Sequence, residues 1–104
     1  MNIQLSHMPN REKKERQFGL TMVMDKGISL RQAEDMIASS SEYIDLVKLG
    51  FGTSVFSTQV KEKVKLYHDA KIKVYLGGTL FEACYVRGEL DKYRKFVEIG
   101  RAHV

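Results

Sequence analysis

Lysines, glycines and acidic residues gather at three points of the sequence, each at the end of an apolar run. They are Asp25, Lys26 and Gly27; Lys48, Gly50, Gly52 and Thr53; and Gly77, Gly78 and Thr79 with Glu82 close behind. Glycines let backbone N–H groups approach an anion, and lysine ammonium groups supply point charges for phosphate or carboxylate. These residue types predict a binding site for an anionic, phosphorylated small molecule.

Lys48 is the strongest candidate for a functional role because of its place in an apolar run. Counted back by two along an extended chain, it shares a face with Leu46 and Ile44. This alternation would aim its ammonium from an apolar face into the mouth of the fold. Asp45 has the opposite parity, and we expect a structural role for it.

Simpler explanations stay open for several of these residues. The segment 77–79 could be only a tight turn, in which Thr79 and Glu82 form a capping box. Asp25 could form an ion pair with Lys26. Glu82 would then be a helix cap first, and a metal ligand or acid only second.

The elements that must position these residues alternate between strand and helix patterns. Apolar runs at 20–24, 43–49 and 73–76 predict short buried strands. Helical spacing follows each of them. Ser29 with Gln32 predicts a capping box for the first helix, Ser57 is a candidate cap for the second, and Gly88 should break the third.

The resulting βαβαβα order predicts an α/β fold with a parallel sheet and right-handed crossovers. A doubly wound open sheet and a (β/α) barrel both fit this order. No G-x-G-x-x-G follows the first strand, which weakens the dinucleotide-binding version. In either architecture the carboxyl ends of the strands meet at one rim, where the three clusters would come together.

Composition excludes several classes of function. The chain has 104 residues, which is typical of one domain, and a formal net charge of +4. The mixed run 11–16 favours a solvated face or a disordered arm over a nucleic-acid surface. Its one cysteine, Cys84, allows no intrachain disulfide and fits a reducing compartment. No apolar run approaches the roughly 20 residues of a membrane helix. We therefore expect a cytoplasmic protein that binds neither nucleic acid nor membrane.

Three stretches resemble the phosphosulfolactate synthase family. They are GLTMVMDKG at 19–27, YIDLVKLGFGTS at 43–54 and VYLGGTLFE at 74–82. The similarity runs from about Arg16 to Val97, and the order and separation of three long motifs make it specific. The resemblance implies a (β/α)8 TIM barrel, of which residues 19–98 would form the first three βα units after a polar arm at 1–18.

The resemblance also implies a magnesium-dependent lyase reaction, in which sulfite adds to phosphoenolpyruvate to give phosphosulfolactate, the first step of coenzyme M biosynthesis in methanogenic archaea. Position and chemistry then assign roles to the clustered residues. Lys48 and Lys26 would hold anionic groups or carry the proton, and Asp25 and Glu82 are the candidate Mg²⁺ ligands. The segments 50–53 and 77–79 would cradle the anions.

Two further functions stay open: a noncatalytic relative, like the heat-stress-associated members in plants, that acts by protein interaction, or a barrel enzyme with another phosphorylated substrate. A full barrel needs about 250 residues, so we expect the chain to be an inactive piece of an enzyme that could be a homo-oligomer.

Residues 99–104 match the translation of a sequencing adapter and are expected to be a non-native tail.

Overall fold

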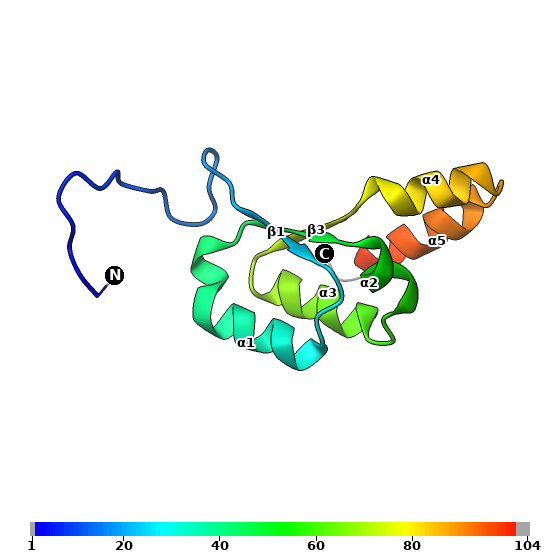
Figure 1. The fold of residues 1–104 in the computed structure, drawn as a ribbon, viewed down its shortest axis with the longest axis horizontal. Coiled ribbons are helices and arrows are strands. Elements are labelled where there is room, and N and C mark those ends of the chain that lie inside the picture. The colour runs from blue at the N-terminus through cyan, green and yellow to red at the C-terminus, as the bar shows by residue number, and fades with distance from the viewer. Residues whose placement is uncertain (1, 102–104) are drawn as a thin grey trace.

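A three-stranded parallel sheet with helices packed beneath it makes up the fold (Figure 1). The computed structural model describes the backbone of residues 2–101 and the side chains of residues 2–98. The elements in chain order are β1 (Met22–Asp25), α1 (Leu30–Ser40), the 3-10 turn η1 (Ser41–Tyr43), β2 (Leu46–Leu49), α2 (Phe51–Phe56), α3 (Val60–Asp69), β3 (Lys73–Leu76), α4 (Gly78–Val86) and α5 (Leu90–Arg101).

The strands pair in the order β1-β2-β3, and both pairs are parallel. Helices α1 and α3 lie side by side below the sheet in Figure 1. Helix α5 packs Phe96 against the same core. A doubly wound sheet would place helices on both faces, whereas the described helices that contact the core do so from one. The chain therefore folds as part of a (β/α)8 barrel, as predicted.

The core lies between the sheet and the helices. Val47 and Leu49 of β2 face the helices and are 0% and 1% exposed. They belong to one cluster with Ala33 of α1 and with Val64 and Tyr67 of α3. The side-chain period of two along β2 selects Val47 and Leu49 for this side and leaves Leu46 and Lys48 for the other.

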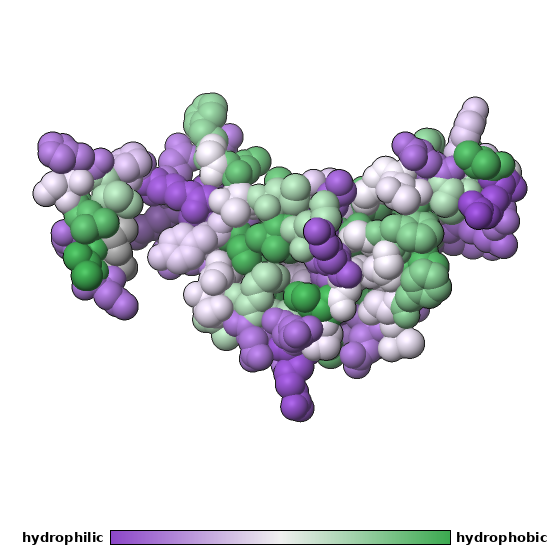
Figure 2. Space-filling model, in the orientation of Figure 1, coloured by the Kyte–Doolittle hydropathy of each residue, from purple (hydrophilic) through white to green (hydrophobic). Residues whose placement is uncertain are grey.

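The upper face of the sheet carries apolar side chains that no described helix covers. Met22, Met24 and Tyr75 are 45%, 41% and 41% exposed. Figure 2 shows apolar surface over the central part of the molecule, where Figure 1 places the strands. In a complete barrel this face lines the interior, so we call it the interior face.

Local sequence signals placed some elements correctly and others with errors at the ends. The third strand and the Ser29–Gln32 capping box are as predicted. The second strand is shorter than 43–49, because residues 41–43 form η1. Ser57 does not cap α3, which begins at Val60 after Gln59.

The start of α4 also differs from the prediction. The helix begins at Gly78 with Gly77 as its N-cap, so Thr79 and Glu82 form no capping box. Thr79 lies one residue inside the first turn, where its side chain cannot cap. The predicted break is confirmed at Gly88, which follows α4 with a φ of +66°.

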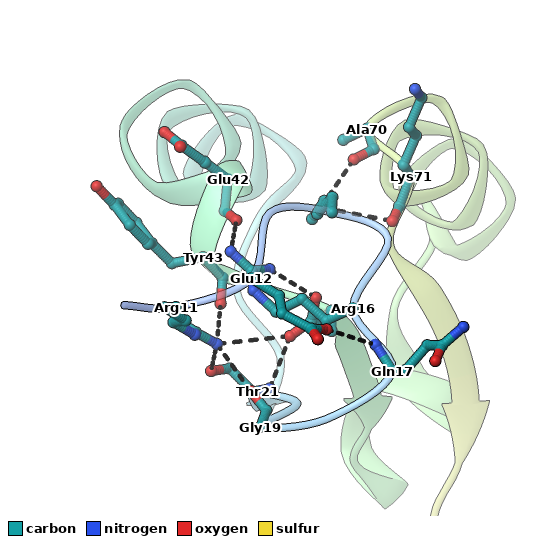
Figure 3. Close-up of polar contacts among 12 residues, drawn as sticks. Arg11, Glu12, Arg16, Gln17, Gly19, Thr21, Glu42, Tyr43, Ala70 and Lys71 are labelled. Atoms are coloured by element: carbon teal, nitrogen blue, oxygen red, sulfur yellow. Dashed lines mark hydrogen bonds and ion pairs between the residues drawn. The ribbon is translucent and has the colours of Figure 1, made fainter. Parts of the chain in front are cut away.

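The polar arm is exposed along most of its length, as expected for the run 11–16, but Lys14 and Arg16 at its end contact the fold. Arg16 is 9% exposed, and its Nη1 donates to Asp45 Oδ1 at 2.8 Å. Its Nη2 donates to the carbonyl of Glu42 at 2.7 Å, and Lys14 Nζ donates to the carbonyl of Ala70 at 3.1 Å (Figure 3). Asp45 thus has the structural role expected from its parity.

The predicted tail is described only in part. The backbone of α5 continues to Arg101, but the side chains of 99–101 and all of residues 102–104 lie outside the described residues. Its non-native origin stays a prediction. Within the described chain, every helix is too short or too polar to cross a bilayer.

Candidate active site

Lys48 lies on the interior face of β2, between two neighbours on the adjoining strands. It is in register with Met24 of β1 and Tyr75 of β3, and its side chain is half-buried. The predicted facing of Lys48 is therefore confirmed, but Ile44 does not share it, because Ile44 is buried in the core cluster with Val47 and Leu49. The side chain passes over the end of β3, since a Cβ added at Gly77 would meet Lys48 Cε at 2.9 Å and Nζ at 3.9 Å.

Gly77 lies next to Lys48 and also at the beginning of α4. It is the N-cap of α4, and α4 has no side-chain cap. The first N–H groups of a helix lack intrahelical partners and carry the positive end of the helix dipole. The Lys48 ammonium and the first turn of α4 therefore form one positive corner at the carboxyl end of the sheet. Such a corner suits a phosphate or a carboxylate.

Lys26 follows the end of β1 and is exposed. Gly50, at the end of β2, lies beside it, because a Cβ added at Gly50 would stand 3.2 Å from the Asp25 carbonyl oxygen and 3.6 Å from Lys26 Cα. The Gly50 N–H donates to that same carbonyl at 2.8 Å. Gly50 thus allows two strand ends to approach closely. We call the carboxyl ends of the three strands, with the turns that follow them, the rim.

Asp25 faces away from the rim and into the layer between sheet and helices. It is 1% exposed, and its Oδ2 lies 2.5 Å from Lys63 Nζ and accepts a hydrogen bond from Tyr67 Oη at 2.8 Å. Its Oδ1 accepts from the backbone N–H of Gly27 at 2.9 Å and of Ile28 at 3.1 Å. Asp25 therefore pairs with Lys63 of α3 and not with its neighbour Lys26.

These contacts keep Asp25 ionised. Burial alone would raise the pKa of its carboxyl, but hydrogen bonds from Lys63, the Gly27 N–H and Tyr67 outweigh burial and lower that pKa. Burial and the hydrogen bond to Asp25 raise the pKa of Tyr67. The carboxylate is charged, and both of its oxygens are occupied.

Comparison with known proteins identifies the family. The family model described as (2R)-phospho-3-sulfolactate synthase (ComA) matches residues 9–101. The chain belongs to the phosphosulfolactate synthase family.

Three curated relatives carry the name phosphosulfolactate synthase. The protein of Methanocaldococcus jannaschii is 48% identical over 79 residues, that of Methanothermobacter thermautotrophicus 40% over 87, and that of Bacillus subtilis 34% over 89. These alignments cover 74%, 82% and 86% of the chain but only 32%, 34% and 35% of the relatives. The chain thus spans about a third of the length of the synthases that it matches.

Within this synthase-family fold, the structure separates the predicted anion-binding residues into two groups. Gly77 lies at the positive corner with Lys48, and Gly78 and Thr79 follow it in the exposed first turn of α4. Gly52 is exposed as well, with open space around it. Thr53 differs, since it is 1% exposed and its Oγ1 donates to the Asp25 carbonyl at 2.8 Å. Its hydroxyl stabilises the end of β1 and is too buried to contact a ligand.

The two predicted magnesium ligands are not brought together. Asp25 is buried on the helix side, because it shares its parity with Val23, while Glu82 is exposed on α4. Among the described residues, no group of three His, Cys, Asp or Glu side chains could hold a metal ion. The magnesium role stays a prediction, and the geometry of Asp25 argues against its part in it.

Sequence reasoning missed Lys63. The residue is 0% exposed, although lysine is among the residues most rarely buried. A signal was present, because Lys63 falls within the apolar helical stripe of Val60, Val64 and Tyr67. A cation on the core-facing stripe of a helix requires an anionic partner, and Asp25 is the only aspartate among the three strands.

Proposed function

We propose that the full-length protein is a phosphosulfolactate synthase, a lyase-class enzyme that adds sulfite to phosphoenolpyruvate. The observation that carries this proposal is the Lys48 side chain lying against Gly77 on the interior face, beside the uncapped N-terminus of α4. Membership of the family and the names of three relatives support it. We further propose a cytoplasmic protein whose partners are these two small anions.

The reaction explains why positive charge is needed at the rim. The sulfite sulfur attacks the methylene carbon of phosphoenolpyruvate, and a C–S bond forms. The π electrons move toward the carboxylate, which gives an enediolate-like intermediate, and a proton then adds to the carbon that bears the phosphate ester. Fixed positive charge near the carboxylate lowers the barrier most when it needs no reorganisation. We assign this charge to Lys48, and anion binding or proton delivery to Lys26.

Magnesium stays within the proposal as the cofactor, but the described residues do not fit its binding site. Asp25 has both oxygens occupied, and Glu82 belongs to no group of three His, Cys, Asp or Glu side chains among the described residues that could hold a metal ion. No step of the mechanism above depends on the ion.

Replacing Lys48 tests the proposal. In the full-length protein, Lys48→Ala should lower kcat, by about 10²–10⁴-fold if the ammonium also delivers the proton. If it only holds the phosphate, KM should rise with kcat nearly unchanged. Lys48→Arg should rescue part of the loss if charge matters more than proton transfer. Phosphosulfolactate formation from phosphoenolpyruvate and sulfite is the assay.

Lys73→Ala is the matched control. Lys73 pairs in register with Leu46 and so has the same facing as Lys48, but it lies at the amino end of its strand, away from the rim. It should keep wild-type kinetics. Near-wild-type kinetics for Lys48→Ala would refute the assignment of Lys48. An inactive full-length wild type would instead favour a noncatalytic relative or another phosphorylated substrate.

A further inference from the structure

The turn that carries Lys26 is tied to Asp25 on the side away from the rim. Asp25 Oδ1 accepts the N–H groups of both Gly27 and Ile28, which closes the backbone around Lys26. Gly27 has a φ of +116°, a backbone conformation that residues with a side chain rarely adopt. The position of Lys26 therefore depends on the orientation of the Asp25 carboxylate.

Lys63 holds both ends of this turn from below. Its Nζ lies 2.5 Å from Asp25 Oδ2 and donates to the Ile28 carbonyl at 2.7 Å. Tyr67, one helical turn further along α3, donates to the same Oδ2. The ammonium thus spans the turn, from the residue before Lys26 to the second residue after it.

A purely packing role does not account for a lysine at this place. Its neighbours on the stripe, Val60 and Val64, are apolar, and a buried ion pair is seldom more stabilising than an apolar pair of similar volume. Lys63 is fully buried beneath β1 and cannot itself touch a ligand on the interior face. Its two contacts instead hold the Asp25 carboxylate before an exposed lysine and the Ile28 carbonyl after it.

We propose that Lys63 is a positioning residue that acts through Asp25 and Ile28 to hold the Lys26 turn at the rim. The catalytic consequence rests on the proposed function, because that function gives Lys26 its role. The mechanical part of the proposal, that Lys63 fixes the turn, is independent of the reaction.

Amide hydrogen exchange in the full-length protein tests the mechanical part. Lys63→Met keeps the length of the side chain and removes its charge, so a peptide covering 22–29 should exchange at least roughly tenfold faster than in the wild type, as its opening becomes more frequent. A peptide covering β3 should be unchanged. Lys65→Met, on the same helix but 61% exposed, is the control and should match the wild type. Unchanged exchange at 22–29 in Lys63→Met would overturn the proposal.

A second variant covers the case in which Lys63→Met folds poorly, since it leaves a buried carboxylate unpaired. Asp25→Asn combined with Lys63→Met removes both charges and keeps Oδ1 as the acceptor for Gly27 and Ile28. This double variant should fold, and its 22–29 peptide should still exchange faster than in the wild type because the Ile28 carbonyl has lost its donor. Wild-type protection there would show that Lys63 is not needed.

A kinetic cycle tests the catalytic consequence. Lys63→Met, or the double variant in its place, should lower kcat/KM by roughly 10–100-fold, as expected when a reacting group is displaced. In a Lys26→Ala background the same change should cost less than about threefold, because residues that act as one unit are not additive. Independent, multiplicative losses would refute action through Lys26. If the wild type lacks synthase activity, the proposed function fails, and hydrogen exchange still decides whether Lys63 holds the turn.

Discussion

At the scale of single residues, the rim depends on a close approach between a lysine and a glycine. Lys48 Cε occupies the space where a side chain at residue 77 would begin. The absence of a Cβ at Gly77 therefore decides how far the ammonium can extend toward α4. The backbone of Gly77, with φ −73° and ψ 160°, is one that any residue can adopt, so conformational freedom is not the reason for a glycine here.

Gly77→Ala should displace Lys48 without harming the fold. The added methyl would lie 2.9 Å from Lys48 Cε, and the flexible lysine would move before the backbone does. We expect kcat/KM of the full-length protein to fall roughly 10–100-fold, with the free energy of unfolding changed by less than about 1 kcal/mol. Steady-state kinetics and urea unfolding measure the two quantities.

Gly78→Ala provides the comparison, because nothing lies within 4 Å of a Cβ at Gly78. It should leave Lys48 in place, so kcat/KM should fall less than in Gly77→Ala. Equal kinetic losses in the two variants would mean that the helix start, and not the position of Lys48, limits the reaction.

At the scale of elements, the arm preceding β1 binds to segments at the amino ends of the strands and holds them together. Arg16 joins Asp45 at the start of β2 and the carbonyl of Glu42, and Lys14 reaches the carbonyls of Ala70 and Lys71 after α3 (Figure 3). Asp45 Oδ2 also accepts the Thr21 N–H that leads into β1. In barrels, interactions at this end serve stability, and the opposite end serves chemistry.

Arg16→Met should therefore destabilise the full-length protein and spare the active site. Removing one partner of a buried ion pair can cost about 3–5 kcal/mol, and the loss here should lie below that range because Arg11 Nη2 stays 3.6 Å from Asp45 Oδ2. Urea unfolding should show this loss, while KM at a temperature where the variant stays folded should be unchanged. Lys13→Met, an exposed change in the same arm, should lie within about 0.5 kcal/mol of the wild type. Equal stability of the two variants would contradict the docking of Arg16.

Acid should loosen the same contacts. Burial would raise the pKa of Asp45, but the Thr21 N–H and Arg16 outweigh burial and lower that pKa below its ordinary value of 3.8; Asp25 behaves in the same way. A lowered folded-state pKa adds stability above pH 3.8, and that stability is lost as pH falls through the folded value.

The unfolding free energy of the full-length protein should therefore fall as pH drops below about 4. Asp45→Asn should be less stable at neutral pH and should show a shallower acid slope. Asp69→Asn, which alters an exposed ion pair, should keep the wild-type slope. A wild-type acid slope in Asp45→Asn would show that this carboxylate does not titrate as the structure implies.

At the scale of the whole molecule, the interior face of the sheet has no described cover. Its exposed methionines and tyrosine border the half-buried Lys48, and only β2 has a neighbour on both sides. Open edges of parallel strands are sites of aggregation, because parallel sheets are normally covered and closed.

The 104-residue chain expressed alone should aggregate or form a molten state. Without a partner for the interior face, too little apolar surface is buried to stabilise a unique packing. Near-UV circular dichroism and thermal melting check this, with the full-length protein as the comparison. A sharp, cooperative melting transition in a monomeric sample would contradict it.

The sequence by itself determined the class of fold, the family and the facing of Lys48. These depend on local spacing, since a period of two places Lys48 opposite Val47 and Leu49, and a capping box needs only residues 29 and 32. Three motifs in order were enough to indicate the family that the comparison then showed.

Only the tertiary structure decided the partners of the charged residues. Asp25 meets Tyr67, 42 positions away, and Arg16 meets Asp45, 29 positions away. No local pattern encodes such pairs, because they depend on how α3 and the arm pack against the sheet. Asp25 looked like a rim ligand from its place at a strand end, but its parity with Val23 and the reach of Lys63 turned it inward. A buried charge is stable only where an opposite charge and hydrogen bonds offset its desolvation. Those partners come together only when elements distant in the sequence pack against one another.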